Sequence, residues 1–325
     1  MSKPWIFISP SSRGIGHALT QHLLQTTSLP ILATARSDPG GVKASILTGL
    51  RLPQPPRPPL SSSTLHEKGT IEATASRLHV VQLDVTDEHT IAAAASRAES
   101  LFPRDAHHLH LGVALPGILW PERSPAQVDY DAALETLRVN VLGPLMLMKH
   151  FGRFLPRKST NVGFESENSD CNYTYDAALL PIDTTSGGEK EEEEERRVPA
   201  GSRNRSRRKL PQHATFLTAS ARVGSVSDNR LGGWYSYRAS KAGVNSLVRT
   251  FDLHLRTQNK GRAIAVAYHP GTVRTGLSRD FWGGVAPGKL FSAEFAAERL
   301  VEVVLSRTPE HGGRCWDWKG EEVLP

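Results

Sequence analysis

Tyr237 and Lys241 are the two residues whose types and spacing point most directly to chemistry. Residues four positions apart lie on one face of an α-helix, so both side chains would point the same way if this segment is helical. A free tyrosine has a pKa of about 10, and a nearby ammonium favours the phenolate and so lowers that pKa. The pair is therefore a candidate proton-transfer device. The alternative is a solvated helix that carries a tyrosine and a lysine without using them.

A glycine-bearing segment near the N-terminus is a candidate pyrophosphate site. The apolar run over residues 5–8 has the composition of a buried parallel strand, and apolar residues with helical spacing follow from Ile15 onward. Small residues with Gly14 and Gly16 lie between the two. They would let the backbone approach a pyrophosphate, which the N–H groups and partial positive charge of a helix N-terminus favour.

Arg36 follows the next predicted strand, residues 31–35, and bears on the choice of dinucleotide. An acidic residue near this place would bind the ribose 2′-hydroxyl of NAD(H), whereas an arginine suits the 2′-phosphate of NADP(H). Arg13 in the glycine segment could assist it. We therefore predict NADP(H), with NAD(H) as the alternative cofactor. Otherwise Arg36 is a surface charge that follows a strand.

Strands and helices alternate along most of the chain, and their ends place the candidate residues. The segments with the composition of strands are residues 5–8, 31–35, 78–83, 109–114, 213–220, 263–268 and 314–318. This alternation predicts an α/β fold, a single doubly wound parallel sheet of Rossmann type in one domain over residues 1–325. Ligands of such sheets bind at the carboxyl ends of the strands, where every candidate motif falls.

Two helix predictions carry a local argument. Asp87 should cap a helix that begins near Glu88. A long apolar helix over residues 130–155 contains Pro144, which should kink it or free a carbonyl. Asn140 lies one turn before that proline, so it is either a buried polar group satisfied locally or part of a solvent relay.

Two segments interrupt the pattern, and we predict insertions without regular structure. Residues 37–76 are rich in proline and serine, which disfavours a regular helix or a central strand. Residues 157–211 hold an acidic run followed by a basic run, a composition typical of disordered segments. The basic run could bind nucleic acid, but the neighbouring acidic run nearly cancels its charge, so we expect no nucleic-acid partner. Unspliced introns are the alternative origin of both segments.

Composition limits the remaining classes. The chain has 325 residues, of which 38% are hydrophobic and 22% charged, as in a folded globular domain. Its two cysteines provide neither a disulfide framework nor a metal cluster, so we expect no metal and a reducing compartment, the cytoplasm. No run of about 18 apolar residues occurs, so no membrane span is expected. The formal net charge of +6 permits acidic ligands such as a phosphorylated cofactor.

Taken together, the motifs resemble the classical short-chain dehydrogenase/reductase family, and within it the C-factor-like bacterial and fungal oxidoreductases. In chain order they are the glycine segment, Asp84 after a strand, Asn140, the Tyr-x-x-x-Lys pair and the Pro-Gly-x-Val-x-Thr run at residues 270–275. Residues 224–237 carry the likeness to the subgroup. Each motif alone is weak, but five in order at compatible spacing are specific, and the likeness covers nearly the whole chain outside the two insertions.

The resemblance implies hydride transfer between NADP(H) and a small-molecule carbonyl or alcohol substrate. Tyr237 would protonate the carbonyl oxygen, Lys241 would lower the tyrosine pKa and hold the nicotinamide ribose, and Asn140 would hold a relay water. The residues expected to line the cofactor are Ser12, Arg13, Gly14, Ile15, Gly16, Arg36, Asp84, Val85, Asn140, Tyr237, Lys241, Pro270, Gly271, Val273 and Thr275. The substrate, the direction of reaction and a homo-oligomeric state stay open.

The chain departs from the family pattern at three places. Pro10 and Pro116 each replace a residue of a family motif, and Ala221 occupies the position of the family's catalytic serine. Ser220 is our candidate for the missing serine, turned inward by a small backbone shift or bulge, and Ser225 is the second candidate. If these departures abolish turnover, the chain is a cofactor-binding regulatory protein of the same fold.

Overall fold

A computed structural model describes residues 1–50, 72–162, 174–176 and 208–325. Its centre is an eight-stranded sheet in which β12 pairs antiparallel and all other neighbours pair in parallel. In sheet order the strands are β12 (Glu322–Val323), β11 (Cys315–Asp317), β8 (Ala263–His269), β7 (Ala214–Ala219), β4 (His107–Ala114), β1 (Lys3–Ser9), β2 (Ile31–Ala35) and β3 (Leu78–Gln82). The predicted α/β fold with a doubly wound sheet is confirmed.

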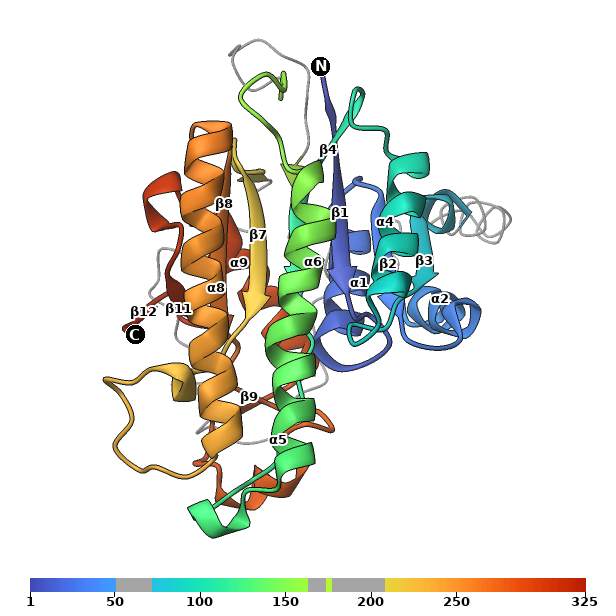
Figure 1. The fold of residues 1–325 in the computed structure, drawn as a ribbon. Helices are drawn as coiled ribbons and strands as arrows, with labels where there is room; N and C mark the ends of the chain where they lie inside the picture. The colour runs from blue at the N-terminus through green and yellow to red at the C-terminus, as the bar shows by residue number, and fades with distance from the viewer. Residues whose placement is uncertain (51–71, 163–173, 177–207) are drawn as a thin grey trace.

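Helices cover both faces of the sheet (Figure 1). One face packs against α1 (Gly14–Thr26), α2 (Pro39–Thr48) and α9 (Ala293–Leu305), and the other against α4 (Glu88–Leu101), α6 (Gly143–Phe151) and α8 (Tyr235–Asn259). Central strands covered on both faces must be apolar throughout. In β1, every residue after Lys3 is buried, which explains why the strand is a continuous apolar run rather than an alternating one.

The helix predicted over residues 130–155 is broken beside its proline. It consists of α5 (Tyr130–Leu137), a π-helical turn η2 (Arg138–Leu142), α6 and the 3-10 turn η3 (Gly152–Phe154). In a regular helix the carbonyl of Asn140 would accept a hydrogen bond from residue 144, but Pro144 has no N–H. The irregularity expected at this proline is confirmed, and it leaves the Asn140 carbonyl without its normal helical donor.

The first predicted insertion is shorter than expected. Residues 39–48 form α2, whose start is capped by Asp38 Oδ1, which accepts a hydrogen bond from Gly41 N at 2.9 Å. Residues 72–76 are also helical. The prediction was wrong here because Pro39 lies in the first helical turn, where a proline starts a helix rather than breaking one. Residues 51–71 lie outside the part of the chain that the structure describes.

Two short pieces of the second predicted insertion pack on the domain. β5 (Thr174–Tyr175) pairs antiparallel with β6 (Arg208–Lys209). Tyr175 is buried, and its hydroxyl lies 2.9 Å from His22 Nε2 on α1. This part is therefore anchored to the core, which the composition did not predict. The acidic run and most of the basic run lie outside the described residues.

Short elements complete the description. β9 (Thr272–Val273) pairs with β10 (Leu290–Phe291), and the remaining 3-10 turns are η1 (Pro125–Gln127), η6 (Arg222–Gly224), η7 (Arg279–Gly284) and η8 (Pro309–His311). The carboxyl ends of β1 and β7 point toward the part of the molecule that holds β9 and α5 (Figure 1). Within the described ranges, no helix has the length and apolar character needed to cross a membrane.

Candidate active site

The start of α8 carries Tyr237 and Lys241 on one helical face, as their spacing predicts. Both side chains are buried, with 7% and 3% of their surface exposed. Lys241 Nζ lies 5.5 Å from the centre of the Tyr237 ring, and it donates a hydrogen bond to Ala219 O at the end of β7 over 3.0 Å. The lysine therefore lies between the tyrosine and the carboxyl end of a central strand.

The protonation of this pair differs from the prediction. Burial raises the pKa of the Tyr237 phenol above its ordinary value, and burial lowers the pKa of the Lys241 ammonium to about 8. Removal from water disfavours the charged form of each group, and for the tyrosine this outweighs the attraction of the nearby ammonium. The expected lowering of the Tyr237 pKa was therefore wrong for this structure, in which the phenol holds its proton at neutral pH.

Asn140 is fully buried, and its side chain binds the backbone of a neighbouring loop. Its Oδ1 accepts a hydrogen bond from Ile118 N at 2.9 Å, and its Nδ2 donates to Ile118 O at 2.9 Å and to Ser240 Oγ at 3.0 Å. A Cβ on Gly117 would lie 3.7 Å from Lys241 Nζ and 3.9 Å from Asn140 Oδ1. The side chain thus matches the locally satisfied alternative.

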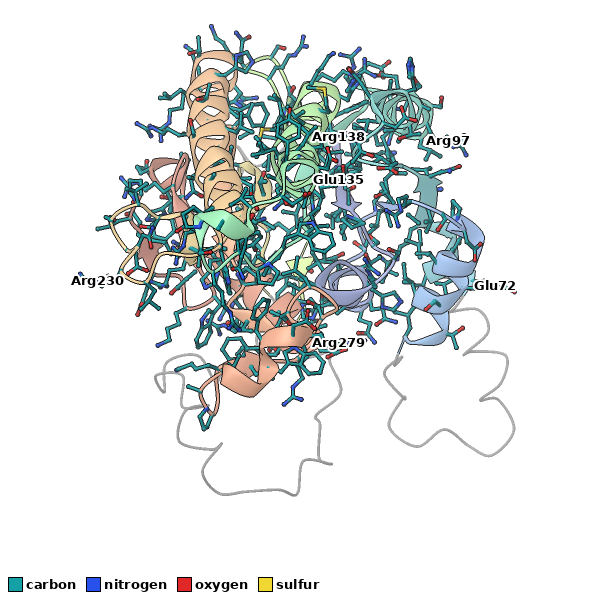
Figure 2. All side chains as sticks on the ribbon, turned by 60° about the horizontal axis from the view of Figure 1, so that its bottom comes forward. Glu72, Arg97, Glu135, Arg138, Arg230 and Arg279 are labelled. Carbon is teal, nitrogen blue, oxygen red and sulfur yellow. The ribbon has the colours of Figure 1, made fainter. Side chains whose placement is uncertain are left out.

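A cavity of about 720 Å³ opens beside Tyr237 at the carboxyl ends of β7 and β8. The side chains that give it an apolar lining include Leu119, Val223, Leu231, Trp234, Leu277, Phe281 and Val285. The Trp234 ring lies 6.1 Å from the Tyr237 ring and 5.0 Å from the Phe281 ring, measured between centres. Tyr237 therefore borders an apolar, partly aromatic space. Figure 2 turns this end of the molecule forward and labels Arg230, which lines the cavity, and Arg279, which begins η7.

Neither candidate serine supplies an uncommitted hydroxyl to this cavity. Ala221 lines it, as does Ser220, but Ser220 Oγ donates to Asn245 Oδ1 at 2.7 Å. The pairing of β7 with β8 has no bulge through Ala219, and Ser220 N continues it by donating to Tyr268 O at 2.7 Å. Ser225 Oγ lies 3.2 Å from Ser227 Oγ and accepts a hydrogen bond from Asp228 N at 3.0 Å. Both hydroxyls serve local structure.

The glycine segment has the shape that a dinucleotide requires. A Cβ on Gly16 would lie 1.9 Å from Pro10 O, and Gly14 has a φ of 58°. The first turn of α1 has no side-chain cap and no acidic residue, so no side chain of the helix start competes for its N–H groups. A Cβ on Gly14 would also lie 3.1 Å from Thr275 Cγ2, so the segment meets the loop after β8. These residues fit a bound dinucleotide.

The residues predicted for the adenosine half have separate environments. Arg36 is exposed at the end of β2, and the Gln82 side chain donates to its backbone carbonyl at 3.3 Å. Asp84 Oδ1 accepts hydrogen bonds from the backbone N and hydroxyl of Thr86, at 2.9 and 2.8 Å. Val85 packs against Gly143, where an added Cβ would come within 3.0 Å. Asp84 thus shapes the turn after β3.

Three residues near Tyr237 were not predicted from the sequence to belong to the site. Trp234 lies inside the subgroup segment but was not expected to pack against the tyrosine. His269 lines the cavity; burial lowers its pKa to about 4, and its Nδ1 has no hydrogen-bond partner within the described ranges. Glu122 contacts the start of α8 from a distant loop. Only His269 could have been found from the sequence, through its place at the end of a strand directly before the predicted Pro-Gly run.

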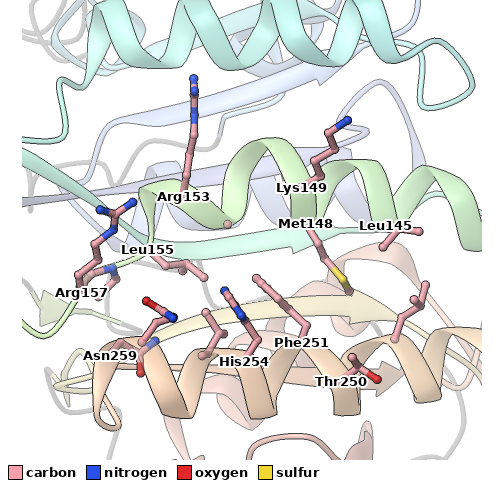
Figure 3. Close-up of a pocket in the computed structure, with 15 residues that line it drawn as sticks. Leu145, Met148, Lys149, Arg153, Leu155, Arg157, Thr250, Phe251, His254 and Asn259 are labelled. Atoms are coloured by element: carbon pink, nitrogen blue, oxygen red, sulfur yellow. The ribbon is translucent and has the colours of Figure 1, made fainter.

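A second cavity, of about 650 Å³, lies between α6 and α8. Figure 3 shows Met148 and Phe251 extending toward each other across it, with Lys149 and Arg153 directed away. It contains none of the residues predicted for catalysis or cofactor binding. Among the described residues, no group of three or more His, Cys, Asp or Glu side chains is arranged to hold a metal ion.

Comparison with known proteins decides the family. No family model matches the chain. A dehydrogenase of 1-hydroxy-2-glutathionyl-2-methyl-3-butene from a Rhodococcus species is 39% identical over 234 residues, which are 71% of this chain and 74% of that protein. The chain belongs to the short-chain dehydrogenase/reductase family.

This member of the short-chain dehydrogenase/reductase family is also 36% identical to the C-signal protein of Myxococcus xanthus over 103 residues. That match covers 32% of this chain and 56% of the relative, so it spans little more than half of the relative's length. Both matches support the resemblance read from the motifs. The chain is an oxidoreductase.

Solved structures with the same fold include several carbonyl reductases. Chicken carbonyl reductase with bound NADPH is 20% identical over the whole of both chains, with a TM-score of 0.66. The carbonyl reductase Sniffer of Drosophila melanogaster gives 19% and 0.64, and a Pseudomonas aeruginosa carbonyl reductase in complex with NADP gives 19% and 0.60. At these identities the likeness shows the fold.

Proposed function

We propose that this oxidoreductase reduces a carbonyl compound with NADPH, or oxidises the corresponding alcohol with NADP⁺. The observation that carries the proposal is the environment of Tyr237, a protonated phenol beside a buried lysine at the wall of an apolar cavity. That cavity adjoins a glycine segment whose shape fits a dinucleotide. The carbonyl reductases with bound NADP(H) among the structural neighbours support the same cofactor.

The nicotinamide supplies the hydride chemistry when the cofactor is bound. Tyr237 donates its phenolic proton to the carbonyl oxygen, so the new O–H bond forms as the tyrosine O–H bond breaks. Lys241 would stabilise the phenolate that remains and would hold the nicotinamide ribose. Because its pKa is about 8, Lys241 carries its charge at neutral pH. The Asn140 carbonyl, whose usual helical donor position is occupied by Pro144, would accept a hydrogen bond from the water that returns a proton to Tyr237.

Cofactor choice rests on charge at the end of β2. Arg36 follows the strand directly and would pair with the 2′-phosphate of NADP(H), with Arg13 at the start of α1 as a second cation. The residues proposed for the rest of the dinucleotide are Ser12, Gly14, Ile15, Gly16, Asp84 and Val85, with Pro270, Gly271, Val273 and Thr275 at the nicotinamide end. Of these, Ile15 and the last four line the cavity that Tyr237 borders.

The cavity lining favours a substrate with an apolar body. The aromatic pair Trp234 and Phe281 lies beside Tyr237 and would pack against the apolar part of a ketone or aldehyde. Substrates with the carbonyl next to an aromatic or branched aliphatic group are therefore the first to test. We place the reaction in the cytoplasm, where NADP(H) and a reduced Cys315 thiol are both compatible with the chain.

One observation favours a second candidate function, a cofactor-binding protein with little turnover. The family's serine position is Ala221, and the neighbouring Ser220 hydroxyl is committed to Asn245. Titration of the purified protein with NADPH and NADH, followed by a screen of carbonyl compounds, separates the two. Turnover with NADPH supports the reductase. Tight NADPH binding with no turnover for any substrate supports the second candidate, and no binding of either dinucleotide rejects both.

A further inference from the structure

Glu122 is a buried carboxylate that belongs to none of the motifs discussed above, with 4% of its surface exposed. Ser236 donates to it twice, from its backbone N to Oε2 at 3.1 Å and from its hydroxyl to Oε1 at 2.5 Å. Trp234 N donates to the Glu122 backbone carbonyl at 2.6 Å. Three hydrogen bonds therefore join Glu122 to the two residues Trp234 and Ser236, and Tyr237 is the next residue along the chain.

These contacts replace a missing helix cap. The first N–H groups of a helix need acceptors from outside it, which the residue before the helix usually supplies. In α8 that residue is Trp234, which makes no side-chain capping bond. Glu122 supplies the acceptor from 114 residues earlier in the chain, and a carboxylate at this end of a helix is further favoured by the helix dipole. Tyr237 lies in the same first turn.

The backbone that leads into this turn is held in an uncommon conformation. Trp234 has a φ of 52° and a ψ of 48°, a left-handed geometry that is uncommon for a non-glycine residue. The Glu122 carbonyl holds it from one side. From the other side Arg238 donates to the backbone carbonyls of Gly233 at 2.9 Å and Val223 at 3.2 Å. The direction in which α8 starts is thus fixed by contacts rather than by local preference.

Glu122 is also one end of a bridge across the cavity wall. Asn140 binds both backbone groups of Ile118, and Glu122 binds the start of α8, so residues 118–122 are attached at both ends. Leu119 lies between the attachments and lines the cavity. We call residues 118–122 the bridge. It connects Asn140, the cavity wall and the turn that carries Tyr237.

We propose that Glu122 is a positioning residue: its carboxylate fixes the first turn of α8 and so sets the place of the Tyr237 hydroxyl. The inference rests on the proposed function, because the position of the Tyr237 hydroxyl matters for the rate only if Tyr237 donates the proton. A misplacement of about 1 Å can cost about a hundredfold in rate. If the carboxylate only stabilised the fold, its removal would lower thermal stability and leave the catalytic rate of the folded protein unchanged.

The test compares Glu122→Gln, Glu122→Ala and Ser236→Ala with Asp129→Ala. Asp129 is the matched control, because its side chain caps α5 by accepting a hydrogen bond from Ala132 N at 2.9 Å. At a temperature where each protein is folded, we expect kcat to fall about tenfold or more in Glu122→Ala and a few-fold in Glu122→Gln and Ser236→Ala. The Kd for NADPH should stay within about twofold in all of them. Asp129→Ala should lose stability and keep its kcat.

Amide hydrogen exchange gives a readout that does not depend on turnover. Loss of the carboxylate should speed exchange at residues 235–238, whereas Asp129→Ala should not. Unchanged exchange there in both Glu122 variants overturns the inference, and so does an unchanged kcat in a Glu122→Ala protein that folds. If the unmodified protein has no reductase activity, the proposed function fails on that result, and the exchange data still decide whether Glu122 fixes the turn. If Glu122→Ala does not fold, Glu122→Gln and Ser236→Ala decide.

Discussion

The two ends of the central sheet bury polar side chains in different ways. At the carboxyl ends, Lys241 and Asn140 are buried with hydrogen bonds to Ala219 and Ile118, beside a cavity of about 720 Å³. At the amino ends, His108 and His213 each bury a ring nitrogen, Nε2, that has no hydrogen-bond partner in the described part of the chain, and the cavity there is only about 20 Å³.

This difference suggests that the carboxyl ends serve ligand binding and that the amino ends serve the stability of the core. At the carboxyl ends, hydrogen bonds hold Lys241 and Asn140 beside a space that a ligand can enter, and His269 is the buried histidine there, with no hydrogen-bond partner for Nδ1 among the described residues. Burial lowers the pKa of both His108 and His213 to about 4, so these histidines are neutral at pH 7 and act as part of the core. We therefore expect substitutions at the carboxyl ends to change chemistry, and changes of pH to act on stability through buried histidines, among them His108 and His213 at the amino ends and His269 at the carboxyl ends.

Lys241→Ala should have the largest effect. It removes the ammonium that serves both Tyr237 and the cofactor ribose, so kcat/KM should fall by about 10²- to 10⁴-fold, the range for acid–base catalysis, and the NADPH Kd should rise. Steady-state kinetics and cofactor titration measure both. His213→Asn, at the opposite end, is the control and should keep its kcat/KM at pH 7. Equal losses in the two variants would show that the ends do not differ in this way.

Arg36→Asp should change cofactor preference by about 10- to 100-fold. A hydrogen bond to a charged group contributes about 1.5–3 kcal/mol, and the new carboxylate repels the 2′-phosphate while accepting a ribose hydroxyl. The ratio of the Kd values for NADPH and NADH gives the answer. Arg97→Asp, on α4, should leave that ratio unchanged. A protein that binds both dinucleotides equally before substitution would contradict the role given to Arg36.

Acid should destabilise the fold through its buried histidines, most of which lie away from the cavity. The folded-state pKa values of His22, His108 and His213 are about 4, below the ordinary value of about 6.5. The unfolded chain therefore binds more protons between these values, and stability that is present above pH about 6.5 is lost as the pH falls toward 4. Each group contributes up to about 1.4 kcal/mol per pH unit.

Urea unfolding at several pH values between 4 and 7 measures this slope. His213→Asn should reduce it by up to one proton. His254→Asn, which replaces an exposed histidine on α8, should leave it unchanged. A slope that is the same in both variants would mean that His213 does not titrate as its burial indicates.

Ser220→Ala should have the smallest effect on catalysis. It removes the hydrogen bond to Asn245, which costs about 1 kcal/mol of stability, but kcat should stay within about twofold because the hydroxyl does not serve the substrate. Ala221→Ser is the contrasting variant. It restores a donor at the wall of the cavity, and we expect kcat to rise. A hundredfold loss in Ser220→Ala would restore the role that the sequence suggested for this serine.

Much of the fold was predictable because strong local signals agreed. The apolar run of β1 and the clear boundaries of β2 allowed these strands of the sheet to be predicted. Pro144 allowed the helix irregularity beside Asn140 to be predicted. α2 was missed because the prolines and serines that follow it were taken as evidence against a helix over the whole of residues 37–76, although Asp and Pro at positions 38 and 39 are residue types of a helix start. The anchoring of Tyr175 depends on a contact with His22 that no local pattern encodes.

The candidate site also has features that could be predicted from the sequence and features that could not. Tyr237, Lys241 and the glycine segment were identified from spacing, because their chemistry requires neighbours along one chain segment. The pKa of Tyr237 was predicted in the wrong direction, because burial is a property of the folded molecule. The Glu122 contact with Ser236 joins residues far apart in sequence, and the commitment of the Ser220 hydroxyl to Asn245 follows from the register of a strand against a helix.

The central claim is that Tyr237 donates the proton in carbonyl reduction, and Tyr237→Phe tests it most directly. The substitution removes one hydroxyl and keeps the ring that packs near Trp234, so the fold and the NADPH Kd should be unchanged within about twofold. Single-turnover oxidation of bound NADPH by a substrate of the unmodified protein should then be slowed by at least about 10³-fold. A Tyr237→Phe protein that turns over at a rate within tenfold of the unmodified one would contradict the assignment.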